Sequence, residues 1–532
     1  MQMGVTTVTL TRPTSAALPE VALPSPNPPG NGHPRRWPIL YTLCSALLVM
    51  SSSVMAVTIA LPAIALDLRA STGQLQWITE TTVLALASLL ITMGTLADRW
   101  GRRRMLLAGL AAFAVASLLA AVSRSPAELV AARALLGVGN AMIMPSTLSI
   151  IRSVFPRSEL PRALAVWGMV ASIGVVVGPL AGGLLVQHLG WRALFLVSVP
   201  AALASACAIT LLVPAFAGGA RTALDLPGMV LVSAGFVTTI YTIIEAPHRG
   251  WSAPPTLATA ALAGTLLAGF VLRQRRTAHP LLDLRMAGAR SFWPAALAAA
   301  AGFFSLMGIL FLLTQYLQDV RGHTPSEAAL VLLPLAAGQL GMAPLSPRLI
   351  DRCGTRTCTT SGLLILAAGL ALLPLGLGGG SQWPLMTALA VLAAGNALTV
   401  TAAGVALMGT ATRHRAGSAA AVNETAFKLG GSLGVAVLGS VATSHLTGRL
   451  STLSAVDALP AFATESITGA MTTAARLGGP TGDQLALLAR DAFMTGFTDA
   501  AHLSAGLALA AAAVTAAFLT DPNIHNPEEE RP

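Results

Sequence analysis

The sequence predicts an all-α membrane protein, and its composition and charge pattern carry that prediction. Hydrophobic residues make up 54% of the 532 residues and charged residues only 10%, whereas about a quarter of the residues in a soluble domain are charged. The net charge of +10 comes from arginines in short clusters between apolar runs, not along one polar face. The basic balance therefore indicates membrane topology, and no nucleic acid partner is expected.

Fourteen apolar segments are long enough to cross a bilayer, since a spanning helix requires about 20 mostly apolar residues. They cover residues 38–61, 76–97, 105–123, 127–150, 162–185, 192–213, 227–246, 255–272, 292–316, 327–347, 359–378, 384–408, 419–443 and 499–520. Residues 1–36 hold seven prolines among small polar residues, a composition typical of a disordered tail. The apolar run that follows is too long for a cleaved signal peptide, so it is expected to remain as the first helix.

Arginine clusters set the expected orientation. The even-numbered connections carry Arg102, Arg103 and Arg104 and further clusters at 152–162, 273–290 and 348–356, whereas the odd-numbered ones carry mostly single arginines. The positive-inside rule then places both termini in the cytoplasm, with 521–532 as a short second tail.

One external connection, residues 444–498, is long and is expected to form an extracytoplasmic hairpin. The apolar spacing of Leu485, Leu488, Ala492 and Phe493 suits an amphipathic helix at least as well as a strand, and the sequence leaves this open.

Two connections resemble each other, which indicates an internal repeat. Residues 94–103 read GTLADRWGRR and residues 347–356 read PRLIDRCGTR. Parallel repeats about an axis along the membrane normal are a common plan of transporters. The expected organisation is a six-helix bundle at 37–213, two linker helices at 214–291 and a second six-helix bundle at 292–520.

Residues 94–106, GTLADRWGRRRML, resemble the loop signature of the major facilitator superfamily, and they lie between helices 2 and 3, where that family has it. The resemblance implies the major facilitator fold, with the two linker helices added to its two six-helix bundles. In the family this signature is a conformational latch, which would here comprise Gly94, Asp98, Arg99, Gly101 and Arg102. The glycine permits close helix approach, and the aspartate can face a helix N-terminus or an arginine. A plain positive-inside loop is the alternative, but it does not require these residues at these intervals.

Helix 4 carries Arg133 within LVAARALLGVGNAMIMP, which resembles the superfamily motif whose buried arginine is tied to proton transfer. The burial of an arginine inside a span costs free energy unless its side chain faces a polar cavity or a partner. We expect Arg133 to face the cavity; a side chain that snorkels to the outer surface is the alternative.

Helix 5 carries a glycine motif that resembles the one found in the antiporter branch of the superfamily. Its residues are Gly174, Gly178, Pro179, Gly182 and Gly183. Small residues permit tight helix packing and the proline bends the helix. The resemblance favours export over uptake, although a generic packing face is the alternative.

Further likenesses run along nearly the whole chain, among them Trp191-Arg192 and Glu424-Thr425. Together they are similar to the fourteen-helix drug:proton antiporters that remove quaternary ammonium compounds and dyes. The resemblance implies a monomer in the cytoplasmic membrane that exchanges protons for a small lipophilic substrate. Broad resistance and the dedicated export of one antibiotic both remain open.

Proton coupling requires a carboxylate inside a span, and few are present. Glu80 on helix 2 is the first candidate, because the quaternary ammonium pumps carry an aspartate at the matching place; an interfacial carboxylate is the alternative. Glu424 at the start of helix 13 is the second, although an ion pair with Lys428 would give it a structural role. The family usually has an aspartate in helix 1 where this chain has Ser53, so either Glu80 carries coupling alone or the substrate is less cationic.

Methionine and phenylalanine side chains on the same helices are candidates for an adaptable cavity lining. They are Met50, Met55, Met142, Met144, Phe303, Phe304, Met307 and Phe311. Packing in the core or against lipid is the alternative for each of them.

Other classes of function find little support in the sequence. No phosphate-binding loop of the G-x-x-x-x-G-K-[ST] type occurs, so the proton gradient is the expected energy source and no cofactor is expected. The four cysteines have no metal-ligand spacing and no metal site is expected. A symporter or uniporter of metabolites is the main alternative, while a membrane enzyme would require a catalytic constellation that the histidines do not form.

Overall fold

The structure, a computed structural model, describes residues 33–156, 159–214, 225–250, 252–277, 290–342, 344–377, 382–409, 416–451 and 461–520. Residues 1–32 of the predicted N-terminal tail and all of the predicted C-terminal tail lie outside this part. Every described element is helical, as the composition predicts. Within these residues, 11 helices are long and apolar enough to cross a membrane.

The helices follow one another in the order that the apolar segments predict. They are α1 (Arg36–Leu68), α2 (Thr72–Trp100), α3 (Arg102–Val122), α4 (Pro126–Val154), α5 (Leu160–Leu189), α6 (Arg192–Leu212), α7 (Leu226–Arg249), α8 (Pro254–Arg276), α10 (Phe292–Gln315) with the π-helical turn η1 (Tyr316–Val320), α11 (Pro325–Val331), α12 (Leu333–Met342), α13 (Leu345–Leu377), α14 (Trp383–Gly409), α15 (Ala416–Leu450), α16 (Ala461–Glu465), α17 (Ile467–Leu477) and α18 (Gly479–Phe518).

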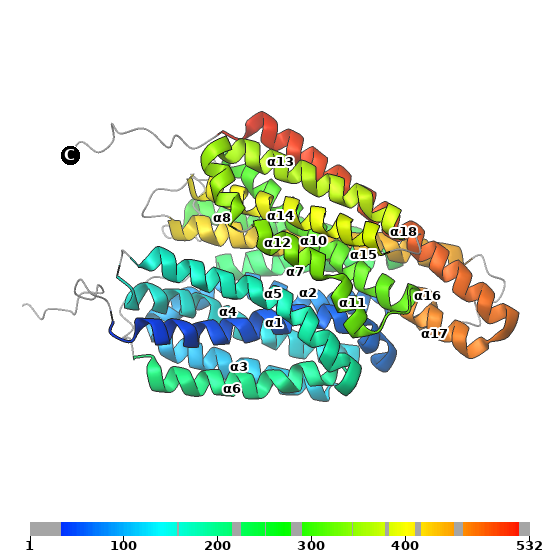
Figure 1. The fold of residues 1–532 in the computed structure, drawn as a ribbon, viewed down its shortest axis with the longest axis horizontal. Coiled ribbons are helices and arrows are strands. Elements are labelled where there is room, and N and C mark those ends of the chain that lie inside the picture. Colours follow the sequence, from blue (N-terminus) through cyan, green and yellow to red (C-terminus); the bar gives the residue numbers. More distant parts are fainter. Residues whose placement is uncertain are drawn as a thin grey trace, which may run out of the picture.

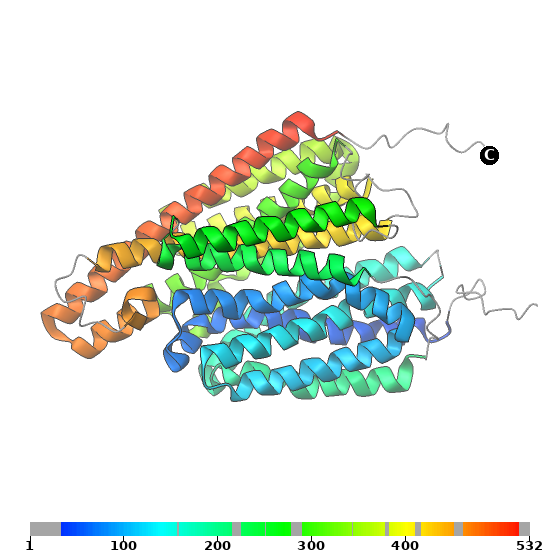
Figure 2. The ribbon, with the colours of Figure 1, turned by 180° about the vertical axis from the view of Figure 1, so that it is seen from behind.

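Two bundles of helices lie side by side (Figure 1). In the first, α1 packs on α5 and α6, α2 on α4, and α3 on α4 and α6. In the second, α10 packs on α14, α15 and α18, and α13 on α14 and α18. Figure 2 shows α7 and α8 running along the boundary between the bundles; α7 contacts α2 and α15, and α8 packs on α7.

The two similar connections of the sequence form similar turns. Helix α2 ends at Gly101, whose φ is 98°, and α3 starts at the next residue. Inside α13 the helix is broken at Gly354, whose φ is 81°. A positive φ favours glycine, which has no Cβ to clash with the backbone. The repeat in the sequence therefore corresponds to a repeated sharp turn, once in each bundle.

The predicted helix at 327–347 is divided in two. Helix α11 ends at Val331, and α12 begins two residues later with Pro334 as its second residue. Proline has no N–H to donate to the preceding turn, which accounts for a break at this position.

Much of the predicted hairpin at 444–498 is helical, a point that the sequence leaves open. Helix α15 continues to Leu450 and α18 already begins at Gly479, because apolar side chains such as Leu446 and Leu485 are buried in the core beyond the expected ends of the spans. The helical interpretation of the stretch around Leu485 is the correct one. Helices α16, α17 and the start of α18 project from the end of the molecule opposite to the one where α1 begins and α18 ends (Figure 1).

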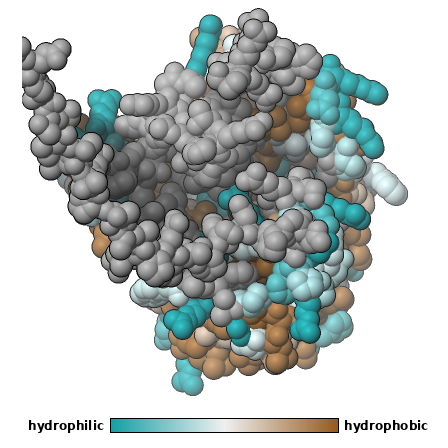
Figure 3. Space-filling view, turned by 90° about the vertical axis from the view of Figure 1, so that its left-hand side faces the viewer, coloured by the Kyte–Doolittle hydropathy of each residue, from teal (hydrophilic) through white to brown (hydrophobic). Residues whose placement is uncertain are grey.

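Hydrophilic residues gather at the end where α1 begins and α18 ends, between apolar flanks (Figure 3). Arg104, Arg276, Arg348 and Arg352 are exposed and lie at helix ends. We refer to this end as the terminal end of the molecule and to the opposite one as the hairpin end.

Candidate functional site: a central cavity between the bundles

A cavity of about 510 Å³ lies between the two bundles. Its walls come from α1, α2, α4 and α5 on one side and from α10, α11, α12, α14 and α15 on the other. This volume lies in the usual range for sites that bind small organic molecules. Because both bundles contribute walls, a movement of one against the other would change its shape.

Soft and aromatic side chains form much of the lining. Of the eight methionines and phenylalanines predicted for this role, Met142 and Phe304 do not border the cavity, and six do: Met50, Met55, Met144, Phe303, Met307 and Phe311. Phe303 also stacks on Phe427 with ring centroids 4.7 Å apart. Such a lining adapts to substrates of different shape.

Glu80 borders the cavity from α2 with only 3% of its surface exposed. Its Oε2 atom has no hydrogen-bond partner among the described residues, and Ser432 lies near it without forming a bond of acceptable geometry. Lys428, which also borders the cavity, and Arg133 are the cations that act on this carboxylate. Removal from water favours the protonated form of a carboxyl group and nearby cations favour the ionised form, so Glu80 is held between opposing influences.

Arg133 is buried, with 1% of its surface exposed, but it does not belong to the cavity lining. Its side chain lies between α4 and α2, where Nε donates to the carbonyl of Ile78 at 2.7 Å and Nη2 to that of Thr79 at 3.2 Å. Thr82 returns a bond from its hydroxyl to the carbonyl of Arg133 at 2.9 Å. The expectation that Arg133 faces the cavity is therefore wrong: it is tied to the backbone of α2 next to Glu80, and it does not snorkel.

Ser53 is buried but does not border the cavity, whereas Ser51, Val54 and Met55 of the same helix do. Adjacent residues on a helix point about 100° apart, so the serine that replaces the family's aspartate faces the helix packing instead. The side chain of Glu424 lies outside the described part of the chain.

The glycine motif of α5 faces two different neighbours. A Cβ on Gly174 would lie 2.6 Å from Ser51 Cβ, and one on Gly178 would lie 2.6 Å from the carbonyl oxygen of Ser52, so α5 packs directly on the backbone of α1. Gly182 also faces α1, at Ala56. Gly183 instead faces α11 of the other bundle, and Pro179 borders the cavity.

The predicted latch is described only in part. Gly94 lies on α2 next to α4, since its Cβ would be 3.6 Å from Pro145 Cβ. Arg102 donates to the carbonyl of Ser149 at 3.2 Å and to the hydroxyl of Ser153, also on α4. The side chains of Asp98 and Arg99 lie outside the described part, and Gly101 makes the turn reported above.

Polar contacts between the bundles gather at the hairpin end. Gln318 of η1 donates to the carbonyl of Ile59 at 2.8 Å, and Ser326 donates to Gln187. Thr72, the first residue of α2, donates to the carbonyl of Glu465. Gln76, one turn further along α2, donates to the carbonyls of Val435 at 3.2 Å and Ala436 at 3.3 Å on α15. Among the described residues, the hydrogen bonds that join the two bundles thus lie on this side of the cavity.

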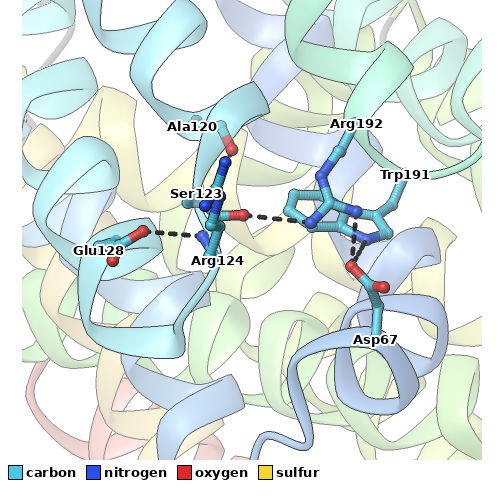
Figure 4. A network of polar contacts seen from close by, with 7 residues as sticks. All are labelled: Asp67, Ala120, Ser123, Arg124, Glu128, Trp191 and Arg192. Carbon is cyan, nitrogen blue, oxygen red and sulfur yellow. Dashed lines mark hydrogen bonds and ion pairs between the residues drawn. The ribbon is translucent and has the colours of Figure 1, made fainter.

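A network on the first bundle fixes its own hairpin end (Figure 4). Arg192 donates to Asp67 at 2.6 Å and to the carbonyl of Ser123 at 3.1 Å, and the indole of Trp191 donates to the same Asp67 at 3.0 Å. The guanidinium group also lies 4.4 Å from the centre of the Trp191 ring. The adjacent Trp191 and Arg192 therefore hold together the end of α1, the α3–α4 connection and the start of α6.

Comparison with known proteins decides the family. The model of the major facilitator superfamily matches residues 42–435. The chain belongs to the major facilitator superfamily. It is thus a multi-pass membrane transporter and not an enzyme, and in the described residues no group of three or more His, Cys, Asp or Glu side chains could hold a metal ion.

Two relatives within the superfamily match almost the full length. The tetracenomycin C resistance and export protein of Streptomyces glaucescens is 35% identical over 512 residues, which cover 93% of this chain and 94% of the relative. The multidrug efflux pump LfrA of Mycolicibacterium smegmatis is 36% identical over 484 residues, covering 90% and 95%. A bacterial homologue of the human lysosomal transporter Spinster, in an inward-facing and occupied conformation, shares the fold with a TM-score of 0.68 at 18% identity, over 91% of this chain and 97% of that one.

The cavity lining includes two buried asparagines that are not among the predicted site residues. Asn140 on α4 and Asn396 on α14 both border the cavity and are buried. A signal for them exists, because each stands in a Gly-Asn-Ala triplet on the fourth span of its bundle. Because asparagine is not ionisable, a prediction based on acidic residues within spans does not include these two side chains.

Proposed function

We propose that the chain exports small lipophilic drugs or antibiotics across the cytoplasmic membrane in exchange for protons, by alternating access. The observation that carries the proposal is Glu80, a buried carboxyl group on a cavity whose walls come from both bundles. A carboxyl group in this place can take a proton on one side and release it on the other as the bundles move. One of the two relatives is a tetracenomycin C resistance and export protein and the other is a multidrug efflux pump, and both support outward transport.

The proposed topology has fourteen crossings with both termini in the cytoplasm. It adds α2, α5 and the α11–α12 pair to the 11 helices that satisfy length and apolarity. The proposed units are the bundles 37–213 and 292–520, joined by the linker helices 214–291, in a monomer. One charge that moves through 100 mV carries about 2.3 kcal/mol, so the proton gradient can drive export without a cofactor.

The proposed mechanism gives separate tasks to the residues of the site. Glu80 exchanges the proton, and Arg133 holds the turn of α2 that carries Glu80. The glycines of α5 keep α1 and α5 packed, and Gly183 permits close contact with α11 when the hairpin end is closed. The latch residues Gly94, Asp98, Arg99, Gly101 and Arg102 stabilise one conformation, and Glu424 contributes a second titratable group.

Glu80→Gln tests the proposal directly. Cells that express the wild type or the variant are loaded with a fluorescent lipophilic cation or with neutral antibiotics, and efflux is followed with and without a protonophore. We expect efflux that the protonophore abolishes in the wild type, and a loss of at least about 10-fold in the variant, because an amide cannot release a proton.

Glu245→Gln is the matched control. It makes the same change on α7, where Glu245 pairs with Arg249 at 3.1 Å and does not border the cavity, so efflux should be unchanged. Full proton-driven export by Glu80→Gln would contradict the role of Glu80. Efflux that resists the protonophore, or net uptake of the compounds, would contradict antiport itself.

A further inference from the structure

Asn140 and Asn396 form a matched pair across the cavity. The triplets Gly139-Asn140-Ala141 and Gly395-Asn396-Ala397 stand on α4 and α14, which occupy the same place in the two bundles. In each triplet the glycine packs on the third span of its own bundle. A Cβ on Gly139 would lie 3.0 Å from the carbonyl oxygen of Gly109 on α3, and one on Gly395 would lie 2.7 Å from that of Gly362 on α13. Because the glycine faces the neighbouring helix and successive side chains on a helix point about 100° apart, the asparagine that follows it faces the cavity.

Three polar atoms of the two amides lack hydrogen-bond partners among the described residues. Asn140 is 0% exposed and neither its Oδ1 nor its Nδ2 atom has a hydrogen-bond partner, and Asn396 is 1% exposed with an unpartnered Oδ1. A buried polar atom without a hydrogen bond destabilises the fold, so natural proteins rarely retain one without a use. The facing helix leaves room for the amide, because Gly302 of α10 would place a Cβ 2.7 Å from Asn396 Oδ1.

The charges around the cavity do not favour a cation. Within the described lining, Glu80 is the one acidic side chain, and Lys428 borders the same cavity. Arg133 adds a second positive charge close to Glu80. A lipophilic cation would therefore meet no excess of negative charge, whereas an uncharged or weakly acidic compound meets no electrostatic penalty.

We infer that the cavity selects uncharged or weakly acidic aromatic compounds with hydroxyl groups on two edges, which Asn140 and Asn396 bind from opposite bundles. This inference rests on the proposed function and specifies its substrate class. An amide offers both a donor and an acceptor, so each asparagine can accept a hydrogen bond from a hydroxyl group or donate one to it. The aromatic and methionine lining, with Trp167, Phe303 and Phe427, packs on the faces of the rings. A site built to form hydrogen bonds discriminates strongly against compounds that cannot form them.

Binding to the full-length protein in lipid nanodiscs tests the inference. The probes are anthraflavic acid, which carries one phenol on each outer ring, its dimethyl ether, and tetraphenylphosphonium, a cation without hydrogen-bonding groups. Asn140→Leu and Asn396→Leu, which preserve the number and branching of the side-chain heavy atoms, should each weaken binding of anthraflavic acid about 10-fold and leave binding of tetraphenylphosphonium unchanged. Asn423→Leu is the matched control, because Asn423 also has an unpartnered Oδ1 but does not border the cavity.

The wild type alone provides a test that does not depend on the folding of a variant. It should bind the dimethyl ether about 10-fold more weakly than anthraflavic acid, and the double Leu variant should bind the two compounds equally. Equal binding of both compounds by the wild type would overturn the inference. So would binding of tetraphenylphosphonium without anthraflavic acid, or Leu variants that bind anthraflavic acid as the wild type does.

Proton-driven export of the same compounds is measured separately, as their accumulation inside everted vesicles. Amide-dependent binding without proton-driven export would overturn the proposed function and support the substrate class. Proton-driven export that is indifferent to both amides would overturn the substrate class and leave the proposed function in place.

Discussion

Arg133 illustrates how this protein accommodates a charge inside a span. Its guanidinium group is buried, and instead of opening onto the cavity it donates to two backbone carbonyls of α2. Hydrogen bonds from a charged group contribute about 1.5–3 kcal/mol each, which offsets part of the cost of burial. The bonds also fix the turn of α2 that places Glu80 at the cavity.

Arg133→Lys should separate charge from geometry at this residue. A lysine keeps the positive charge, but its single ammonium group cannot reproduce the fork that reaches the carbonyls of Ile78 and Thr79. We expect a melting temperature about 2–4 °C lower in detergent and efflux slowed about 10-fold. Arg124→Lys, at an exposed arginine before the same helix, should change neither; equal effects of the two substitutions would contradict the assigned role.

Helix α5 connects packing within one bundle to contact with the other. Gly174, Gly178 and Gly182 face α1, and Gly183 one residue later faces Pro325 and Ala329 of α11. A side chain at the first three positions would disturb the first bundle itself. One at Gly183 would act only where the bundles meet.

Gly183→Ala should therefore open the hairpin end. The added Cβ would lie 2.7 Å from the carbonyl oxygen of Pro325, closer than a Cβ can approach. Spin labels at the exposed Leu189 and Leu477 report the separation of the bundles at this end, and we expect the population at long distance to rise at least about twofold. Gly264→Ala, where nothing lies within 4 Å, is the control; identical distance distributions for all three proteins would refute the prediction.

The linker helices α7 and α8 are held together by a buried carboxylate at the terminal end. Asp225, directly before α7, is 2% exposed at its side chain and accepts bonds from Arg273 Nε at 2.6 Å, Gln274 at 3.1 Å and the N–H of Gly228 at 3.1 Å. Burial acts to raise the pKa of Asp225, but the bonds from Arg273, Gly228 and Gln274 outweigh it and hold the pKa below its ordinary value of 3.8.

Asp225→Asn should destabilise the protein in a pH-dependent way. Because the pKa is lowered in the folded protein, the stabilisation is fully present above the ordinary pKa and is lost as the pH falls through the lowered one. We expect the variant to melt about 1–3 °C below the wild type near neutral pH. The difference in melting temperature should disappear as the pH falls below about 4, because Asp225 is then protonated in the wild type and asparagine still caps the helix in the variant. A difference that is constant across this range would show that charge is not involved.

At the scale of the whole molecule, the structure is closed at the hairpin end. Within the described chain, the hydrogen bonds between bundles, from Gln318, Ser326, Thr72 and Gln76, lie on that side. The arginines at the terminal end instead bond within their own bundles, as Arg102 does to α4 and Arg356 to the carbonyl of Ala516 on α18. Opening toward the hairpin end would break a small number of neutral hydrogen bonds, each with a net contribution of about 1 kcal/mol. Proton binding and substrate binding can supply energies of that size.

The proposed orientation predicts which cysteines a membrane-impermeant maleimide reaches. Cys353 is exposed at the terminal end, beside the turn at Gly354, and a cysteine in place of the exposed Thr481 lies at the hairpin end. In a Cys207→Ser background, which removes the other exposed cysteine, intact cells should label Thr481→Cys and leave Cys353 unlabelled until they are permeabilised. The reverse pattern would place the termini outside.

The order of the helices and the repeat of the two bundles could be predicted because both depend on local properties of the chain. A bilayer requires long apolar helices, and a sharp turn between two of them requires a residue that tolerates positive φ, so runs of apolar residues and the glycines at 101 and 354 carry the information themselves. The residue at which α15 ends and the residue at which α18 begins were predicted less accurately, because packing between these helices continues beyond the apolar runs.

The sequence by itself determined that the chain is a helical membrane protein of repeated design with an acid on the second helix, since composition, periodicity and motifs are properties of single segments. Only the tertiary structure decided which side chains share the cavity. It turned Ser53 and Arg133 away from it and brought Glu80 together with Lys428, and Asn140 with Asn396. The physical reason is that the direction of a side chain depends on the rotation of its helix, which is fixed by packing against neighbours far away in the chain.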